Sequence, residues 1–263
     1  MTAAPAPTQL LRLENVGLEF AGQAILGGVD LSLSSDELVV VVGPSGSGKT
    51  SLLRLAAGFR RASSGLVTLN GQAITAPGAE RAVVFQDDAL FPWLNARDNV
   101  AFPLRLLGGI PRAERIRRAD AQLATVGLEG YGDRRLWQLS GGQRQRVGLA
   151  RALVVQPAFL LMDEPFAALD ALTRAQMQTV LLDVWSRHRQ GVLFITHDID
   201  EALLLATRLV VLTGRPARVG ETLTLDFGRR LLAGTPLREI RADAEFQRLR
   251  EDVLERLFRP EAA

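Results

Sequence analysis

The segment from Leu38 to Lys49 constrains the fold more than any other part of the sequence. Leu38–Val42 is an unbroken run of Leu and Val, and a strand that is apolar on both faces is typical of the interior of a parallel sheet. The run leads into a glycine-rich loop at Gly43, and a helix is predicted from about Lys49. A buried strand, a glycine loop and a helix in this order predict an α/β fold with a parallel core sheet.

The glycine-rich loop has the spacing of a phosphate-binding loop. Gly43–Thr50 reads GPSGSGKT and fits the pattern G-x-x-x-x-G-K-[ST], in the strand-to-helix context that the pattern requires. Its glycines allow backbone N–H groups to surround phosphates, and the helix N-terminus adds the positive end of its dipole. We expect Lys49 to reach the β- and γ-phosphates of a nucleotide and Thr50 to place its hydroxyl on Mg²⁺. A glycine-rich turn without a ligand is the weaker interpretation.

A second apolar strand ends in two carboxylates. Phe159–Met162 is apolar, and Asp163 and Glu164 follow it directly. Carboxylates at the carboxyl edge of a parallel sheet suit a hard cation and an activated water. Asp163 would bind Mg²⁺, directly or through water, and Glu164 would orient and polarise the attacking water as general base. Taken alone, a strand that ends in Asp-Glu is more often a turn; together with the Gly43–Thr50 loop, it favours a catalytic site.

A second helix N-terminus also has features of an anion site. The segment Leu139–Gln143 (LSGGQ) contains a hydroxyl at Ser140 and two glycines, and it precedes apolar residues at helical spacing. A helix start of this kind offers N–H groups to an anion. The simpler alternative is an N-cap, because serine is a good capping residue. Since the Gly43–Thr50 loop already accounts for one nucleotide, a second phosphate site requires a second ligand or the nucleotide of a neighbouring subunit.

Composition narrows the classes of function. Lys49 is the single lysine among 31 basic residues, and 29 acidic residues leave a net charge of +2, so nothing indicates a nucleic-acid binder. The absence of cysteine excludes a disulfide scaffold, a thiolate metal site and a cysteine nucleophile. Only two histidines are present, which argues against a multi-histidine metal site, and His188 is expected at an exposed helix end. No run approaches the about 18 apolar residues of a membrane span, and residues 1–8 lack the pattern of a secretory signal.

The rest of the sequence divides into regions that differ in composition and in the spacing of their apolar residues. Residues 1–8 form an Ala- and Pro-rich tail that we expect to be disordered. Alternating apolar residues in Leu11–Phe20 and Ile25–Leu33 predict strands joined at Gly22, hence an N-terminal antiparallel β layer. Helical patterns in Asn95–Gln156 predict an inserted helical subdomain. The other predicted elements are strands at Leu66–Leu69, Ala82–Phe85, Phe159–Met162, Val192–Thr196 and Leu209–Leu212, and helices at Leu172–His188 and Ile199–Thr207.

The three motifs Gly43–Thr50, Leu139–Gln143 and Phe159–Glu164, in this order, resemble those of ATP-binding cassette (ABC) ATPases. Leu-Ser-Gly-Gly-Gln is the signature sequence of that family, and the likeness extends over roughly Leu11–Gly214. The resemblance implies an α/β fold of the P-loop NTPase class, an ABC cassette with a parallel core sheet, an N-terminal antiparallel β layer and a helical signature subdomain.

We expect the domain organisation that this resemblance implies. Residues 9–235 would form the ABC ATPase domain, with the helical subdomain at about 88–156, and residues 236–263 would form a C-terminal helical tail.

The resemblance also assigns roles to single residues. Phe20 stands at the adenine-stacking aromatic, although Tyr is commoner there, Gln86 at the lid glutamine and Asp170 in the D-loop. His197 stands at the switch histidine, which would hydrogen-bond the γ-phosphate and the water at Glu164; without this context a lone histidine is more simply a core or capped residue. The residues expected in the site are catalytic Glu164, His197 and Gln86; ATP-binding Phe20, Gly43, Pro44, Ser45, Gly46, Ser47, Gly48, Lys49, Thr50 and Ser51; Leu139, Ser140, Gly141, Gly142 and Gln143 of the signature, acting in trans; Asp170 of the D-loop; and the Mg²⁺ ligands Thr50, Gln86 and Asp163.

Within the family, the sequence is most similar to the ATPase subunits of taurine importers. We therefore expect an ATP-hydrolysing, energy-coupling subunit of a taurine importer. Aliphatic sulfonates, nitrate and thiamine precursors remain alternative cargoes, because an ATPase subunit does not touch the cargo. The residues that carry this likeness are Gly78–Arg81, Val84–Gln86, Trp137–Leu139 and Gln176–Thr179, and, beyond the cassette, Phe227, Arg229, Arg230, Ala233 and Gly234.

The resemblance implies several partners. Two copies would form a head-to-tail dimer with each ATP and its Mg²⁺ between Gly43–Thr50 of one chain and Ser140–Gln143 of the other, which one surface used twice can supply. A transmembrane permease subunit would place a short cytoplasmic helix beside Gln86, against Phe91–Trp93 and the helix from Asn95; packing of these aromatics inside the helical subdomain is an equal alternative. A periplasmic or extracellular substrate-binding protein would act indirectly. The expected location is peripheral, at the cytoplasmic face of the inner membrane.

Two other classes of protein fit the sequence less well. Non-transport ABC ATPases, such as translation factors and repair proteins, usually have two cassettes or a long coiled-coil insertion, and neither pattern is present. A GTPase of the usual type would need an Asn-Lys-x-Asp motif, which is impossible because Lys49 is the single lysine. The signature sequence argues against a small-molecule kinase.

Overall fold

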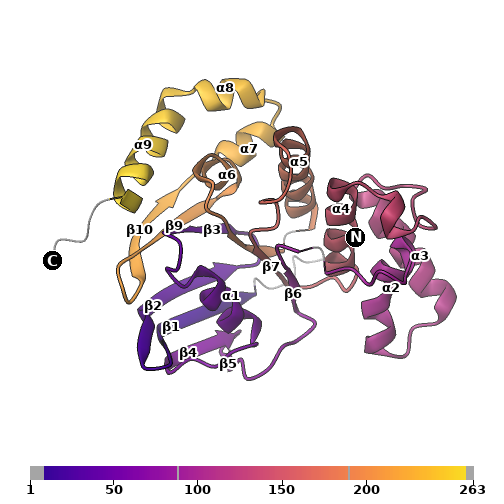
Figure 1. The fold of residues 1–263 in the computed structure, drawn as a ribbon, viewed down its shortest axis with the longest axis horizontal. Helices are drawn as coiled ribbons and strands as arrows, with labels where there is room; N and C mark the ends of the chain where they lie inside the picture. The colour runs from indigo at the N-terminus through magenta and orange to yellow at the C-terminus, as the bar shows by residue number, and fades with distance from the viewer. Residues whose placement is uncertain (1–8, 88, 189, 259–263) are drawn as a thin grey trace, which may run out of the picture.

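The structure is a computed structural model that describes residues 9–87, 89–188 and 190–258 (Figure 1). The tail expected at residues 1–8 lies outside the described residues. Within those ranges the strands form a six-stranded core sheet and a four-stranded sheet.

The core sheet provides the edge on which the site is built. Its strands, in spatial order, are β10 (Arg218–Thr224), β9 (Arg208–Thr213), β3 (Leu38–Val42), β8 (Gly191–Ile195), β7 (Phe159–Asp163) and β6 (Arg81–Val84). The five strands from β9 to β6 are parallel, and β10 pairs antiparallel with β9. Every residue of β3 is buried, as its apolar run predicted. The carboxyl ends of β3, β8 and β7 therefore lie next to one another at one edge.

The N-terminal residues form the expected antiparallel layer. It contains β1 (Leu10–Phe20), β2 (Gln23–Ser34), β4 (Ser64–Leu69) and β5 (Gln72–Ala73), in the order β2-β1-β4-β5. Apolar side chains of β1, β2 and the helix α1 (Lys49–Ala57) form one buried cluster with Val39 and Val41 of β3. The alternate residues of β3, Leu38, Val40 and Val42, belong to the cluster on the opposite face, because successive side chains of a strand point to opposite faces.

The helical subdomain lies at one end of the molecule (Figure 1). It contains α2 (Ala96–Leu107), α3 (Arg112–Thr125), a short 3₁₀ turn at Leu136–Gln138 and α4 (Gly141–Leu153). Asn95 caps α2 by accepting a hydrogen bond from the Asp98 backbone N–H, and Pro111 immediately precedes α3, a position where its missing N–H costs nothing.

The remaining helices cover the second face of the core sheet. They are α5 (Ala171–His188), α6 (Ile199–Leu205), α7 (Phe227–Leu232), α8 (Leu237–Ala242) and α9 (Ala244–Phe258). Helix α9 packs along α6. Its Phe246 ring contacts the Phe227 ring of α7 edge-on, with 5.1 Å between the ring centres. His188 ends α5 and is exposed, as expected.

Three details differ from the elements predicted. Strand β5 is only two residues long, and β10 has no fully buried position, so neither produced a recognisable pattern. The predicted end of α6 at Thr207 is wrong, because the helix ends at Leu205. The reason is tertiary: the Thr207 hydroxyl accepts from the Leu38 N–H at 2.9 Å and donates to the Leu38 carbonyl at 3.1 Å, which ties it to β3.

Candidate functional site

The Gly43–Thr50 loop leaves the N-terminus of α1 without a side-chain cap. Gly48, the residue before α1, has a φ of 83°, and no side chain accepts from the first turn. A positive φ of this size is accessible mainly to glycine. The first N–H groups of α1 are therefore available to an anion, in a position where the helix dipole is positive.

Lys49 is held in place by the loop that precedes it. Its Nζ donates to the carbonyl oxygens of Gly43 at 2.8 Å and Pro44 at 2.9 Å, and the residue is only 7% exposed. Burial lowers the pKa of the Lys49 ammonium, an effect that the nearby carboxylates of Glu164 and Asp163 oppose. The amine is thus fixed beside the loop with a reduced water shell, which strengthens its attraction for phosphate oxygens.

A hydroxyl and a carboxylate meet beside the lysine. The Thr50 hydroxyl donates to Asp163 Oδ1 at 3.0 Å, although the two residues are 113 positions apart. Burial raises the pKa of Asp163, and the hydrogen bond from Thr50 opposes that rise. One hydroxyl and one carboxylate match the few protein ligands that Mg²⁺ takes when phosphates and waters complete its shell.

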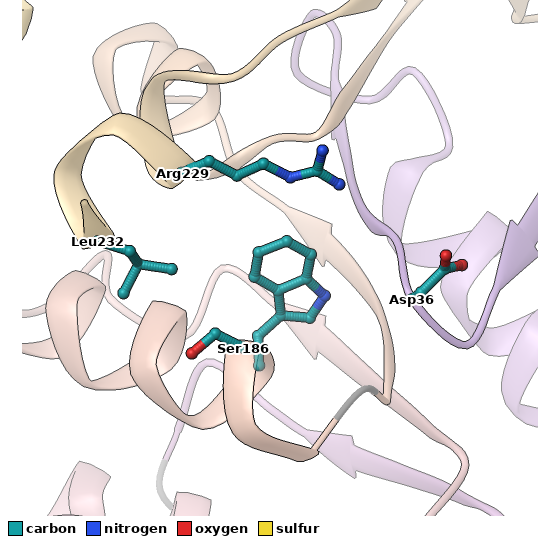
Figure 2. A pocket seen from close by; sticks show the side chains of 5 residues that line it. Asp36, Ser186, Arg229 and Leu232 are labelled. Atoms are coloured by element: carbon teal, nitrogen blue, oxygen red, sulfur yellow. The ribbon is translucent and has the colours of Figure 1, made fainter. Parts of the chain in front are cut away.

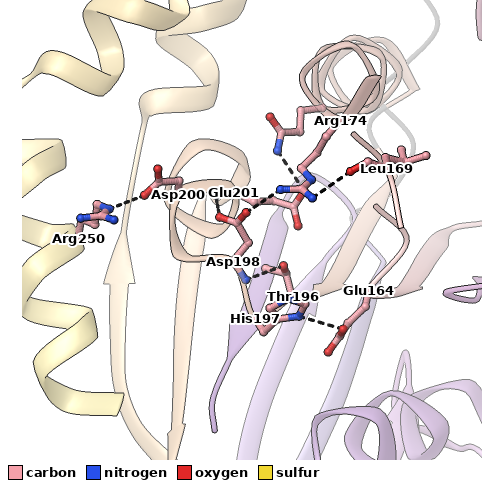
Figure 3. A network of polar contacts seen from close by, with 10 residues as sticks. Glu164, Leu169, Arg174, Thr196, His197, Asp198, Asp200, Glu201 and Arg250 are labelled. Carbon is pink, nitrogen blue, oxygen red and sulfur yellow. Dashed lines mark hydrogen bonds and ion pairs between the residues drawn. The ribbon is translucent and has the colours of Figure 1, made fainter. Parts of the chain in front are cut away.

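Glu164 and His197 face each other at the ends of β7 and β8 (Figure 3). His197 Nδ1 and Glu164 Oε2 are 3.0 Å apart. The Glu164 backbone N–H donates to the Ile195 carbonyl at 3.0 Å, and Glu164 has a φ of 46°. A left-handed conformation at a residue other than glycine is uncommon and costs free energy. The structure thus orients this carboxylate beyond the end of its strand.

Residues of the Gly43–Thr50 loop, together with Glu164 and His197, line a cavity of about 360 Å³, and Asp163 is not part of this lining. It combines an uncapped helix start, one ammonium, one carboxylate and one imidazole, which suits a polyphosphate and an attacking water. Of the residues expected in the site, Ser45, Gly46, Gly48, Lys49, Thr50, Glu164 and His197 line it.

Other expected residues lie outside the lining of this cavity. Phe20 is 59% exposed, and the Arg60 guanidinium lies 5.0 Å from the centre of its ring. Gln86 is exposed, and its carbonyl accepts from the Gln145 side chain of α4 at 3.1 Å. Asp170 accepts from the N–H of Thr173 at 2.9 Å and so caps α5. Each of these residues contacts other residues of its own chain, and none of them lines the cavity.

The signature segment forms a capped helix start within one chain. Ser140 Oγ accepts from the Gln143 backbone N–H at 3.3 Å, and Gln143 Oε1 accepts from the Ser140 N–H at 2.9 Å. This reciprocal arrangement is a capping box. The alternative interpretation of Ser140 as an N-cap thus describes its state in the single chain, and the segment contributes nothing to the cavity lining.

Sequence comparisons identify the family. Residues 26–167 match the family described as ABC transporter. The "Taurine import ATP-binding protein TauB" of Pseudomonas putida is 56% identical over 251 residues, which cover 95% of this chain and 95% of that protein. The chain belongs to the ABC transporter ATP-binding family. Proteins of the same name from Sinorhizobium fredii and Mesorhizobium japonicum are 57% and 54% identical to this ABC ATPase, over 90% and 96% of its length and 88% and 99% of theirs.

Solved structures show the same cassette fold. "Dimeric Structure of MJ0796, a Bacterial ABC Transporter Cassette" matches with a TM-score of 0.72 and 30% identity, over 82% of this ABC ATPase and 98% of that chain. A post-hydrolysis state of the same cassette, bound to ADP and Pi, matches with a TM-score of 0.71 and 30% identity, over the same shares. The fold class predicted from the sequence is confirmed, and nucleotide binding follows from membership of the family.

Sequence reasoning missed residues that hold the site together. Arg174 bonds both the Leu169 carbonyl and Asp198 at 3.1 Å, and Gln145 holds the Gln86 backbone. The sequence contains little indication of these contacts, because arginine and glutamine side chains on a helix usually face solvent. Arg174 stands one helical turn after Asp170, a spacing that could have drawn attention to it.

A larger cavity of about 440 Å³ shares no lining residue with the cavity at the Gly43–Thr50 loop (Figure 2). It is lined by Asp36 before β3, by Trp185 and Ser186 at the end of α5, and by Arg229 and Leu232 of α7. The Arg229 guanidinium lies 5.9 Å from the centre of the Trp185 ring, a cation–π contact between two of the lining residues. Among the described residues, no helix has the combination of length and apolarity needed to cross a membrane.

Proposed function

We propose that this ABC ATPase hydrolyses ATP to drive the import of taurine. The assignment of taurine as the transported substrate rests on the 54–57% sequence identity, over nearly the full length, to proteins named for taurine import. The tail is included in that match, so the likeness is not limited to motifs that all cassettes share. Aliphatic sulfonates, nitrate and thiamine precursors are the alternative cargoes.

In this proposal the cavity at the Gly43–Thr50 loop binds the triphosphate of ATP. Lys49 contacts the β- and γ-phosphates, and backbone N–H groups from Ser45 to Ser51 surround them. Glu164 accepts a proton from the water that attacks the γ-phosphate in line, and His197 donates a hydrogen bond to the γ-phosphate. The 3.0 Å contact between His197 and Glu164 supports these roles, because it keeps both side chains beside the loop. Phe20 stacks on adenine.

Thr50 and Asp163 are proposed to hold Mg²⁺, with Gln86 as a further ligand. The hydroxyl and the carboxylate already lie 3.0 Å apart, so one small cation beside them fits the donor set. The ion supplies positive charge to the phosphates. When no ion is bound, the hydrogen bond to Asp163 keeps the Thr50 hydroxyl oriented.

The active form is proposed to be a head-to-tail dimer. Ser140–Gln143 and Asp170 lie outside the lining of the cavity in their own chain, which leaves them available to the nucleotide of a second chain. A dimeric structure among the solved cassettes supports this arrangement. One surface used twice closes such a dimer.

A permease helix is proposed to dock on the helical subdomain beside Gln86. An apolar cavity of about 280 Å³ lies between β6, α2 and α4, and Leu106 and Leu107 at its rim are 76% and 53% exposed. The aromatics nearby behave differently: Phe91 packs on Phe102 at 4.5 Å between ring centres, whereas Trp93 is 68% exposed. An amphipathic helix would cover these apolar side chains.

Docking to a permease would place the chain at the cytoplasmic face of the inner membrane, where a periplasmic or extracellular binding protein acts on it only through the permease. The domain boundaries proposed remain 9–235 and 236–263, with the helical subdomain at about 88–156.

The cargo is tested with the assembled transporter in proteoliposomes. ATP hydrolysis is measured while the binding protein is loaded with taurine, an alkanesulfonate or nitrate. We expect taurine to stimulate hydrolysis most. Stimulation by another cargo alone would overturn the assignment of taurine. An ATP hydrolysis rate that is the same with every loaded binding protein would contradict coupling to import.

A further inference from the structure

Arg174 connects the two segments that carry the groups of the site (Figure 3). Its guanidinium donates to the Leu169 carbonyl and to Asp198 Oδ2, both at 3.1 Å. Leu169 is the residue before Asp170, and Asp198 is the residue after His197. The planar fork of arginine can hold two acceptors in a fixed relation. One side chain therefore joins the segment that follows β7 to the segment that follows β8.

Both ends of this connection are themselves fixed. Asp198 accepts from the Glu201 N–H at 3.0 Å, which caps α6, and its own N–H donates to the Thr196 hydroxyl at 3.0 Å. At the other end, the Leu169 N–H donates to the Phe166 carbonyl at 3.2 Å. His197 thus lies between two restrained neighbours. A change in the Arg174 contact would reach His197 through Asp198, its neighbour in the chain, and through the hydrogen bond between Asp198 and Thr196.

A second contact repeats the connection one helical turn further along. Gln178, four residues after Arg174 on α5, donates to Glu201 Oε1 at 3.0 Å. Glu201 is 4% exposed, and its burial raises the pKa of the carboxyl. This buried contact keeps α5 and α6 together in the absence of Arg174. The loss of Arg174 should therefore loosen the loops at the site without separating the helices.

We propose that Arg174 is a positioning residue that holds the segment of Glu164 and Asp170 in register with His197 during ATP hydrolysis. Arg174 does not line the cavity at the Gly43–Thr50 loop, and it acts by keeping the Glu164 and His197 side chains in contact range. The inference rests on the proposed function for its effect on turnover. Its structural part, the connection between two loops, stands on the contacts alone.

The test compares Arg174→Met and Arg174→Lys with the unchanged full-length protein. Methionine keeps much of the length and removes all donors, whereas lysine can reach one acceptor. We expect kcat for ATP hydrolysis to fall about 10- to 100-fold in Arg174→Met, with KM for ATP almost unchanged. Arg174→Lys should recover part of kcat. A merely structural role would not separate kcat from KM in this way.

Arg250→Met is the matched control. Arg250 of α9 donates to Asp200 on the same helix α6 at 2.7 Å, so its removal also breaks an arginine–aspartate contact to α6, but on the side away from the site. We expect kcat, KM and thermal stability to stay near those of the unchanged protein. An equal loss of kcat in Arg250→Met would overturn the specific role of Arg174.

Hydrogen exchange of the nucleotide-free protein gives a readout that does not depend on turnover. Arg174→Met should speed amide exchange together in residues 166–173 and 195–201, and Arg250→Met should not. If exchange in either segment is unchanged, the connection is refuted, whatever the activity. If the unchanged protein fails to hydrolyse ATP while both segments loosen, the connection is supported and the proposed function is refuted.

Discussion

The helix starts of α1 and α4 use opposite arrangements for the same backbone groups. Each helix begins with N–H groups that have no partner within the helix. At α4, a capping box satisfies two such donors, the N–H groups of Ser140 and Gln143. At α1, Gly48 provides no side chain, and no cap is formed. The start of α4 is capped within one chain, whereas the start of α1 is uncapped and can receive an anion. Two glycine-rich segments of similar appearance therefore differ in whether they need a ligand.

The glycines of the two segments also differ in their purpose. Gly48 adopts a φ of 83°, which few other residues tolerate. A Cβ on Gly142 would instead lie 2.3 Å from Thr173 Cγ2, so this glycine allows α4 to approach the start of α5. One glycine shapes the backbone around a ligand, and the other permits packing within the chain.

Replacement of Lys49 should have the largest effect, because it removes the only charge of the loop at α1. In Lys49→Ala, the β- and γ-phosphates lose their ammonium, and ATP hydrolysis should fall by at least about 10²-fold. ATP affinity, measured by equilibrium binding, should fall as well. Unaltered hydrolysis would show that the uncapped helix start alone is sufficient.

Chemical labelling provides a check on the same residue without substitution. Lys49 is the single side-chain target for an amine-selective reagent. ATP should protect it, whereas AMP, which lacks the β- and γ-phosphates, should not. Equal labelling with and without ATP would contradict contact between Lys49 and the phosphates.

Glu164→Gln should affect turnover and leave binding intact. An amide cannot accept the proton of the attacking water, so hydrolysis should fall by about 10²-fold or more, while ATP still binds and holds two chains together. Size-exclusion chromatography with ATP would detect the dimer. Glu129→Gln, a change at an exposed residue outside the cavity, should be silent. Normal hydrolysis in Glu164→Gln would remove its role as general base.

Ser140 allows the comparison of the two helix starts to be tested directly. Ser140→Ala removes the cap of α4 and should cost about 1 kcal/mol of stability, whereas Ser140→Asn should restore it because asparagine also caps. If Ser140 also contacts a nucleotide in trans, hydrolysis should be reduced several-fold in both variants. Unchanged ATP hydrolysis in Ser140→Asn would show that Ser140 acts only as the N-cap of α4.

Mixing two inactive variants checks the trans arrangement. A heterodimer of Ser140→Arg and Lys49→Ala chains keeps one site in which both residues are native. Nucleotide should be trapped at that site and in neither homodimer. If trapping is missing in the mixture, the head-to-tail dimer is wrong.

The smallest expected effect is that of Asp163→Asn on the stability of the nucleotide-free protein, which is separate from the loss of a proposed Mg²⁺ ligand. Burial raises the pKa of Asp163 above its ordinary value of 3.8, so the folded protein holds this proton more tightly than the unfolded chain. Stability of the nucleotide-free protein therefore falls as pH rises from that value through the raised pKa. Asparagine does not titrate, so the substitution removes this pH dependence of stability. The Tm of Asp163→Asn should exceed that of the unchanged protein by about 2–4 °C at most near neutral pH.

The pH dependence distinguishes the two helix starts. Thermal unfolding at a series of pH values should show the gain of Asp163→Asn shrinking toward acid pH, whereas the loss in Ser140→Ala should stay constant, because Leu139–Gln143 contains no ionisable side chain. A constant gain in Asp163→Asn would mean that burial of the charge is not its cause.

Much of the fold was predictable because its signals are local. The apolar run of β3 predicted a buried strand, and the Gly43–Thr50 spacing predicted where a helix begins. Strand β10 was missed because it is an edge strand with polar residues on its exposed positions. The end of α6 was misplaced because the Thr207 hydroxyl bonds the backbone of Leu38, a partner that no local pattern reveals.

The sequence by itself determined the chemistry of the Gly43–Thr50 loop, since the spacing of its residues fixes which backbone and side-chain groups surround one anion. It also determined that Asp163 and Glu164 end a strand. Only the tertiary structure decided that Thr50 meets Asp163 and that Glu164 meets His197, because the order β3-β8-β7 brings together residues 113 and 33 positions apart. Arg174 belongs to the same class: its role depends on two loops that meet only after the sheet has formed.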